Sequence, residues 1–300
     1  PYETLVGFNT NDQLLITING NGATGGSATT SGVFRDPSAW YHIVAYVDMS
    51  ASGQANKARI YVNGNQQTVT YITLTTTDNT EVNNNVIHRI AANSYALSSY
   101  FDGYLTDINF IDGQALEPYY FGNNDAYGNW KPILYKGMYG TNGFYLTFAD
   151  TSALTTSSNA GLGKDTSGNG NYWATNNISI TAGTTYDAML DVPTNTSATV
   201  ANYATLNPLI PSTLTYSEAN LTVQRTTSNW EATGSTISVS QGKWYAEFVW
   251  TAGTYAIIGV EDMDLVSTWD NEYIGYSANG RGYGWDGNVR NNASDSAYGS

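Results

Sequence analysis

Few side chains in this sequence have the types and spacing that catalysis requires. The two histidines, His42 and His88, each lie within an apolar, strand-like stretch. No Gly-x-Ser-x-Gly or His-Glu-x-x-His motif accompanies them, so the sequence indicates neither a hydrolase triad nor a zinc site. Cysteine is absent, which excludes thiol catalysis, thiolate metal ligands and disulfides. Both histidines are predicted to be structural.

One acidic stretch has the residue types that cleave glycosidic bonds. Asp262 and Asp264 lie close together, and Glu272 follows a short distance along the chain. Paired carboxylates are the groups that glycoside hydrolysis uses. These residues come after the end of a predicted strand, where a solvated acidic loop is the better interpretation. The protein is therefore predicted not to be an enzyme, with polysaccharide depolymerisation as the less favoured alternative.

Residues 165–170, Asp-Thr-Ser-Gly-Asn-Gly, have the pattern of the first half of a calcium loop. Oxygen-bearing side chains alternate there, and a glycine supplies the bend. Asn176 stands where such a loop needs its glutamate, and no helices are predicted to flank it. A structural turn is favoured and no cofactor is predicted, while calcium remains an alternative.

The charge and composition exclude several classes of partner. The chain has 25 acidic and 11 basic residues, for a net charge of −14, which repels nucleic acid phosphates. No apolar run approaches the ~20 residues that a membrane span needs, so no membrane insertion is predicted. The chain begins with Pro1 in mid-strand, and it is predicted to be a fragment of a longer polypeptide.

Short apolar runs separated by Gly, Asn, Asp or Ser clusters predict a β-sandwich. Residues 40–48 are apolar on both faces and are predicted to form a central strand. Residues 57–63 form another, with residues 66–72 returning as its partner. A strand between the Asp-Gly turns at Asp102 and Asp112 follows.

A second strand-rich block begins near residue 214. In residues 242–250 Trp244, Phe248 and Trp250 lie on one predicted strand face. Residues 255–261 predict a further strand in this block.

The strand motifs resemble two known domain families. The motifs Trp40-x-His-x-Val, Ile60-Tyr-Val-Asn-Gly and Phe101-Asp-Gly-Tyr-Leu are similar to the second half of a laminin-G-like, concanavalin-type domain. Gly242-Lys-Trp-Tyr, Ile258-Gly-Val and the Gly-Tyr pair at residues 275–276 resemble SPRY domains, another concanavalin-like sandwich. Their order resembles that of virion and tail-fibre proteins of marine and cyanobacterial tailed phages.

The resemblance implies an all-β fold of two concanavalin-like antiparallel sandwiches, or jelly rolls, joined by a polar connecting segment. The expected domains are residues 1–150 (laminin-G-like, its N-terminal strands missing), 151–213 (rich in Ser, Thr and Asn) and 214–300 (SPRY-like, truncated). Laminin-G-like domains sometimes hold calcium near their rim, where Asp48 and Asp107 are conceivable ligands.

The expected function is that of a virion appendage, a tail-fibre or adhesin-like protein that attaches to the host by binding its surface polysaccharide. The resemblance implies an extracellular place on the virion surface, contacts with other virion subunits and a homotrimer. A purely structural or decoration protein of the virion is the alternative.

Sugar-binding surfaces commonly present aromatic side chains among Asn, Asp and Gly on loops. Ring faces stack on sugar C–H groups, while amides and carboxylates bind hydroxyls. Residues 95–100 and 273–285 have this character, although burial of the aromatics in strands is the alternative for the second stretch. The predicted ligand-binding residues are Tyr95, Tyr100, Tyr273, Asn279, Arg281, Tyr283 and Trp285.

Overall fold

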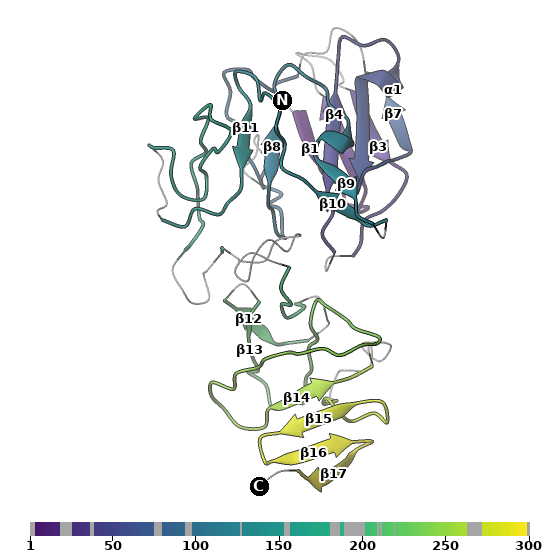
Figure 1. Cartoon of the computed structure of the whole chain (residues 1–300), viewed down its shortest axis with the longest axis vertical. Helices are drawn as coiled ribbons and strands as arrows, with labels where there is room; N and C mark the ends of the chain where they lie inside the picture. The colour runs from purple at the N-terminus through teal and green to yellow at the C-terminus, as the bar shows by residue number, and fades with distance from the viewer. Residues whose placement is uncertain are drawn as a thin grey trace. The chain divides into compact units, whose positions relative to one another are not determined.

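The computed structural model forms two compact units (Figure 1). The first unit comprises residues 1–177 and 192–202, and the second residues 178–191 and 203–300. The domain limits predicted at residues 150 and 213 stay a prediction. The structure describes residues 4–18, 26–36, 39–74, 80–93, 98–126, 128–152, 157–180, 187–188, 202–208, 210, 212–218, 220–262 and 272–298.

The predicted all-β class is confirmed, since the described elements are strands apart from one four-residue α-helix and one short 3-10 helix, and every described strand pair is antiparallel. The elements of the first unit are β1 Thr4–Phe8, β2 Leu14–Ile18, β3 Gly26–Thr30, β4 Ile43–Val47, α1 Gln54–Lys57, β5 Ala58–Val62, β6 Asn65–Gln66, β7 Val69–Ile72, β8 Ile108–Phe110, η1 Pro118–Tyr120, β9 Gly122–Asn124, β10 Trp130–Pro132 and β11 Phe144–Leu146.

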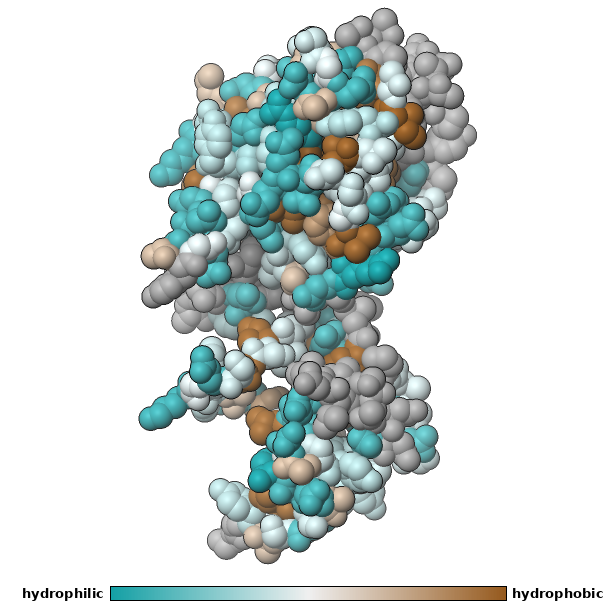
Figure 2. Space-filling model, turned by 90° about the vertical axis from the view of Figure 1, so that its right-hand side faces the viewer, coloured by the Kyte–Doolittle hydropathy of each residue, from teal (hydrophilic) through white to brown (hydrophobic). Residues whose placement is uncertain are grey.

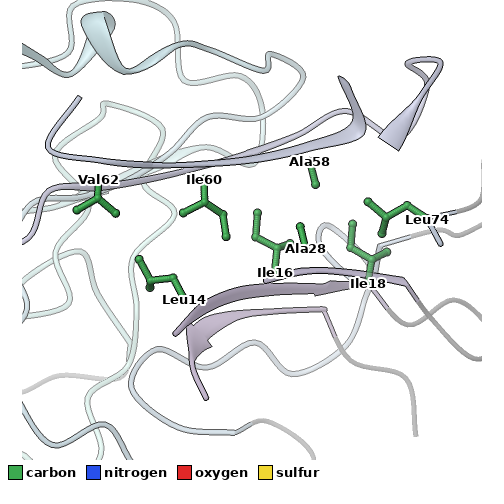
Figure 3. Close-up of a cluster of buried hydrophobic side chains, with 8 residues drawn as sticks. All are labelled: Leu14, Ile16, Ile18, Ala28, Ala58, Ile60, Val62 and Leu74. Atoms are coloured by element: carbon green, nitrogen blue, oxygen red, sulfur yellow. The ribbon is translucent and has the colours of Figure 1, made fainter. Parts of the chain in front are cut away.

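Two sheets pack face to face around one apolar core in the first unit. One sheet has the order β1-β2-β3-β7 and the other β4-β5-β6. Side chains of β2 and β3 point toward those of β5 (Figure 3). Alternation along β2 buries every second residue, so that Ile16 and Ile18 are fully enclosed. Each such aliphatic side chain contributes roughly 1.5–3 kcal/mol by its burial.

Among the described strands, β4 lies at the edge of its three-stranded sheet, so the prediction of a central strand is wrong. Its two apolar faces have a different cause. Ile43 and Val47 pack on the sandwich core, while Val44 packs on a second cluster formed by Phe121, Tyr135 and Tyr139. One strand thus separates two hydrophobic clusters.

The chain after β5 divides between the two sheets, which corrects the predicted return along β5. Of the two described strands in this stretch, β6 pairs with β5, whereas β7 pairs with β3 of the opposite sheet. Backbone hydrogen bonds mark the change, because Gln67 N donates to Ile60 O of one sheet and Thr68 O accepts from Ser31 N of the other. This crossing closes one edge of the sandwich.

The strand predicted between the two Asp-Gly turns is shorter than expected. Only β8, Ile108–Phe110, is regular, and it pairs with β11. Asp107 has a positive φ of 52° and so interrupts an extended chain just before β8. Within β8 the pairing sets Phe110 against Phe144, whose ring centroids are 5.4 Å apart.

The second unit contains a four-stranded antiparallel sheet of order β14-β15-β16-β17. One face of this sheet carries Gly282 and Gly284, and a Cβ on Gly282 would lie 2.2 Å from the carbonyl oxygen of Ile274. The chain at residues 274–275 therefore packs directly on the sheet backbone. The strands are β12 Thr215–Ser217, β13 Thr222–Gln224, β14 Ile257–Val260, β15 Arg281–Gly284, β16 Asn288–Asn291 and β17 Ser294–Ala297.

Residues 242–250 do not form the predicted strand. The segment pairs with none of the described strands, and Trp244 and Phe248 are exposed. Alternation selects a face only where a second layer covers it, and no described segment covers this one. Of the other two motifs of the SPRY resemblance, Ile258-Gly-Val lies in β14 of the sheet, whereas residues 275–276 lie at a turn that packs on the sheet without pairing with it.

We predict that Ile16→Ala lowers the free energy of unfolding of the first unit by about 2–4 kcal/mol, because it leaves a cavity in a fully enclosed site. The matched control is Ile72→Ala on β7 of the same sheet, where Ile72 is 64% exposed and the expected change is within about 0.5 kcal/mol. Urea unfolding followed by circular dichroism measures both, and equal losses would contradict this core.

Candidate functional site

Trp130 joins the β9–β10 hairpin to the sandwich through His42. The indole Nε1 donates to His42 Nδ1 over 3.0 Å. The ring fits because Gly64 and Gly122 have no side chain, and a Cβ on either would lie 2.3 Å from the indole. Burial lowers the pKa of His42, and the Asp107 charge opposes this by raising it. His42 is thus a structural acceptor.

Tyrosine hydroxyls connect β8, β11 and the second cluster of the first unit. Tyr145 donates to Asp107 over 2.6 Å, and Tyr139 donates to Asn109 over 2.9 Å. Burial raises the pKa of Tyr139 to about 12 and also raises that of Tyr145. Both phenols therefore act as neutral donors that hold the β8 region against β11.

The loop with a calcium-like pattern is a structural turn. The buried Asp165 carboxylate accepts hydrogen bonds from the backbone N–H groups of Tyr145, Ser167 and Asn171 and from the Ser167 hydroxyl. Asn169 and Asn171 donate to the carbonyl oxygen of Gly143. These N–H donors occupy the carboxylate that a cation would need. Nowhere in the described part of the chain do three metal-ligating His, Asp or Glu side chains gather.

Glu117 and Arg59 form the ion pair that anchors the chain after β8 to the sandwich. Arg59 Nη1 lies 2.6 Å from Glu117 Oε1, and the Tyr61 hydroxyl donates to Glu117 Oε2. The guanidinium also lies over the Tyr46 ring, 4.6 Å from its centroid. Both charged side chains are partly exposed, so this pair borders the surface.

Directly after Glu117, the 3-10 helix η1 turns two tyrosines to solvent. Its three-residue period places Pro118 and Phe121 on one side, and both are buried. Tyr119 and Tyr120 lie on the other side, 63% and 43% exposed, with ring centroids 4.7 Å apart. The hydrogen bond with Tyr120 raises the pKa of Tyr119. We call Tyr119 and Tyr120 the tyrosine pair.

The structure divides the predicted ligand-binding residues of the second unit between two faces. Arg281 and Tyr283 lie on the exposed face of β15, and Asn279 is exposed in the preceding loop. The Tyr283 ring meets Tyr298 edge-on at 6.1 Å. Arg281 donates to the carbonyl oxygen of Gly280, which directs its guanidinium back toward the loop. These three residues remain predicted binding residues.

Tyr273 and Trp285 instead belong to an aromatic cluster on the covered face. Trp230 contacts both, with centroid distances of 5.2 and 6.1 Å. The buried Arg290 guanidinium lies 4.7 Å from the Trp285 centroid. Its hydrogen bond to Asp286 lowers the pKa of that carboxyl to about 2. These contacts give Tyr273 and Trp285 a packing role, whereas their predicted ligand contact stays untested.

The remaining predicted residues are separate from these groups. Tyr100 is 67% exposed in the first unit, while Tyr95 lies outside the described residues. Asp262 follows the end of β14, as expected, and its carboxylate accepts a hydrogen bond from Asn279 over 3.2 Å. Asp264 is outside the described residues. The paired-carboxylate alternative therefore stays a prediction.

Residues 2–118 match the family model Laminin_G_3, described as the concanavalin A-like lectin/glucanases superfamily. The match covers β1 to β8 and ends at Pro118, the first residue of η1. It confirms the laminin-G-like, concanavalin-type resemblance for this part of the chain. A domain of this superfamily is compatible with carbohydrate binding. No curated protein and no solved structure matches the chain.

The SPRY and virion resemblances remain predictions. The sequence patterns did not lead us to predict the tyrosine pair. Its signal was present, because Glu117-Pro118-Tyr119-Tyr120 sets an acid and a proline before two aromatics.

Apolar side chains reach the face in Figure 2 only as small patches among hydrophilic ones. No helix in the described ranges is long and apolar enough to cross a membrane.

We predict that the first unit loses stability as the pH falls below 6.5, the ordinary pKa of histidine. In the folded state the pKa of His42 is lower than 6.5. At a pH below 6.5 the unfolded chain therefore binds the proton more readily than the folded chain does. His42→Gln should remove this slope between about pH 5 and pH 8, because the amide oxygen accepts from Trp130 without titrating.

The matched control is His88→Gln at the exposed histidine, which should keep the wild-type slope. Urea unfolding at a series of pH values measures it. A slope that persists in His42→Gln would contradict the role assigned to His42.

Proposed function

We propose that this protein binds carbohydrate on a host cell surface, as a non-enzymatic appendage of a phage virion. The observation that carries the proposal is the lectin/glucanase superfamily match over residues 2–118, on a sandwich with a buried apolar core. The exposed side chains of Asn279, Arg281 and Tyr283 add amide, guanidinium and aromatic groups of the kind that bind sugars.

The virion part of the proposal is supported by the order of the sequence motifs. A laminin-G-like half-domain, an Asn/Gly-rich turn and a SPRY-like block follow one another as in phage virion proteins. The absence of cysteine fits a protein assembled in a bacterial cytoplasm. An extracellular place on the particle, contacts with other virion subunits and a homotrimeric state complete the proposal.

We predict that the purified chain adheres to host cells and that periodate oxidation of those cells abolishes adhesion, because periodate cleaves the vicinal diols of sugars. Protease treatment of the same cells is the control and should leave adhesion intact. Arg281→Ala combined with Tyr283→Ala should weaken adhesion, since both side chains are exposed on β15.

Adhesion can be measured with fluorescently labelled protein and flow cytometry. Adhesion that survives periodate but not protease would contradict a glycan receptor. No adhesion to any host, together with firm assembly into a capsid or tail, would favour a structural or decoration protein.

We also predict that incubation with host capsule or lipopolysaccharide releases no reducing ends. The superfamily includes glucanases, so the measurement is needed. Release that disappears in Asp262→Asn or Asp264→Asn would identify a depolymerase and contradict the non-enzymatic proposal.

A further inference from the structure

We propose that the tyrosine pair, Tyr119 and Tyr120, is a stacking subsite for uncharged sugar residues, bordered by Glu117 and Arg59. This inference rests on the proposed carbohydrate binding and names the site and the ligand class. The pair begins at the end of the matched region, so the superfamily match does not assign it.

The first argument is that exposure of the pair is built into the fold. The same turn of η1 that buries Pro118 and Phe121 directs both tyrosines outward. A large exposed apolar surface costs free energy in water, and contiguous patches of this kind commonly mark binding surfaces. Two phenol rings also lose little conformational entropy on binding, because each has only two side-chain torsions.

The second argument is that the pair stands on a rigid base. Glu117 ties the start of η1 to Arg59 and Tyr61 on β5. At the other end of η1, Phe121 packs on the Tyr135 ring at 5.1 Å, and Ile133 N donates to Phe121 O. A binding surface that is ordered before the ligand arrives avoids the entropic cost of ordering it.

The third argument concerns the polar groups that border the rings. Arg59 and Tyr61 donate to different Glu117 oxygens, and each carboxylate oxygen keeps a further lone pair for a sugar hydroxyl. The two phenol hydroxyls stand on the exposed side of η1. Ring faces for C–H groups and acceptors for hydroxyls therefore occur together, which is the combination that a pyranose needs.

The charges select the ligand class. Arg59 is neutralised by Glu117, lies over the Tyr46 ring and donates to Ala55 O and Asn56 Oδ1. It therefore offers no unpaired positive charge to a uronate or sialate. The chain as a whole carries a net charge of −14, which repels acidic polymers. Neutral hexose units fit this site and acidic ones do not.

The test uses the full chain on immobilised neutral homopolymers of glucose, galactose and mannose, with polygalacturonate alongside. Wild type is expected to bind at least one neutral polymer and to bind polygalacturonate more weakly. Tyr119→Ala combined with Tyr120→Ala should lower the affinity for the neutral polymer about tenfold or more. The control is Tyr245→Ala, at a tyrosine that is 85% exposed in the second unit, and it should change nothing.

A further variant tests the charge argument. Glu117→Gln leaves the Arg59 charge unpaired beside the rings, so it should shift the ratio of affinities toward polygalacturonate severalfold. An unchanged ratio would overturn the assignment of Glu117 as the residue that sets the ligand class.

Other results separate this inference from the proposed function. Wild-type binding to a neutral polymer that survives in the double alanine variant would overturn the subsite while leaving carbohydrate binding intact. No binding of wild type to any polymer or host cell would overturn both. If sedimentation shows that the double variant loses binding only because its oligomer dissociates, the pair is a subunit contact and the subsite is overturned. Thermal unfolding of each variant confirms that the first unit stays folded.

Discussion

The burial of β2 and β3 against β5 is the interaction on which the rest of the first unit depends. Leu14, Ile16 and Ile18 alternate along β2, and this alternation makes one sheet face apolar. Once that face is covered, β4 is held beside β5 with Val44 on its other side. Val44 then becomes part of the support for the second cluster, which includes Phe121. The segments after β8, including η1 and the β9–β10 hairpin, therefore pack on strands whose position the sandwich core determines.

Close packing on glycines and one ion pair hold the β9–β10 hairpin and η1 against the sandwich. The Trp130 indole lies against Gly64 and Gly122, where any side chain would displace it, and its N–H donates to the partly buried His42. The Arg59–Glu117 pair is partly exposed, so its Coulomb attraction is screened and contributes modestly to stability. Its more important effect is geometric, since it fixes the direction in which η1 leaves the sandwich. The tyrosine pair is exposed as a consequence.

Each unit contains both packed and exposed aromatic residues. In the second unit Trp230, Tyr273 and Trp285 pack together on the glycine-lined face of the sheet, and the buried Arg290 closes the cluster. In the first unit η1 presents Tyr119 and Tyr120 to solvent without disturbing the buried Phe121. The aromatic content of the sequence does not distinguish the packed cluster of the second unit from the exposed tyrosine pair. Burial separates the packing residues from those that can meet a ligand.

Local patterns in the sequence determined the all-β class, the alternation that buries β2, and the turn at Asp165. Each of these depends on contacts between near neighbours, or on the fixed two-residue period of a strand. Only the tertiary structure decided that β4 is apolar on two faces because two clusters flank it, that β7 joins the opposite sheet, and that none of the described segments covers residues 242–250. It also decided which predicted binding residues face outward and that the tyrosine pair is exposed. The physical reason is that alternation marks a face as apolar, while pairing between distant segments determines what covers that face.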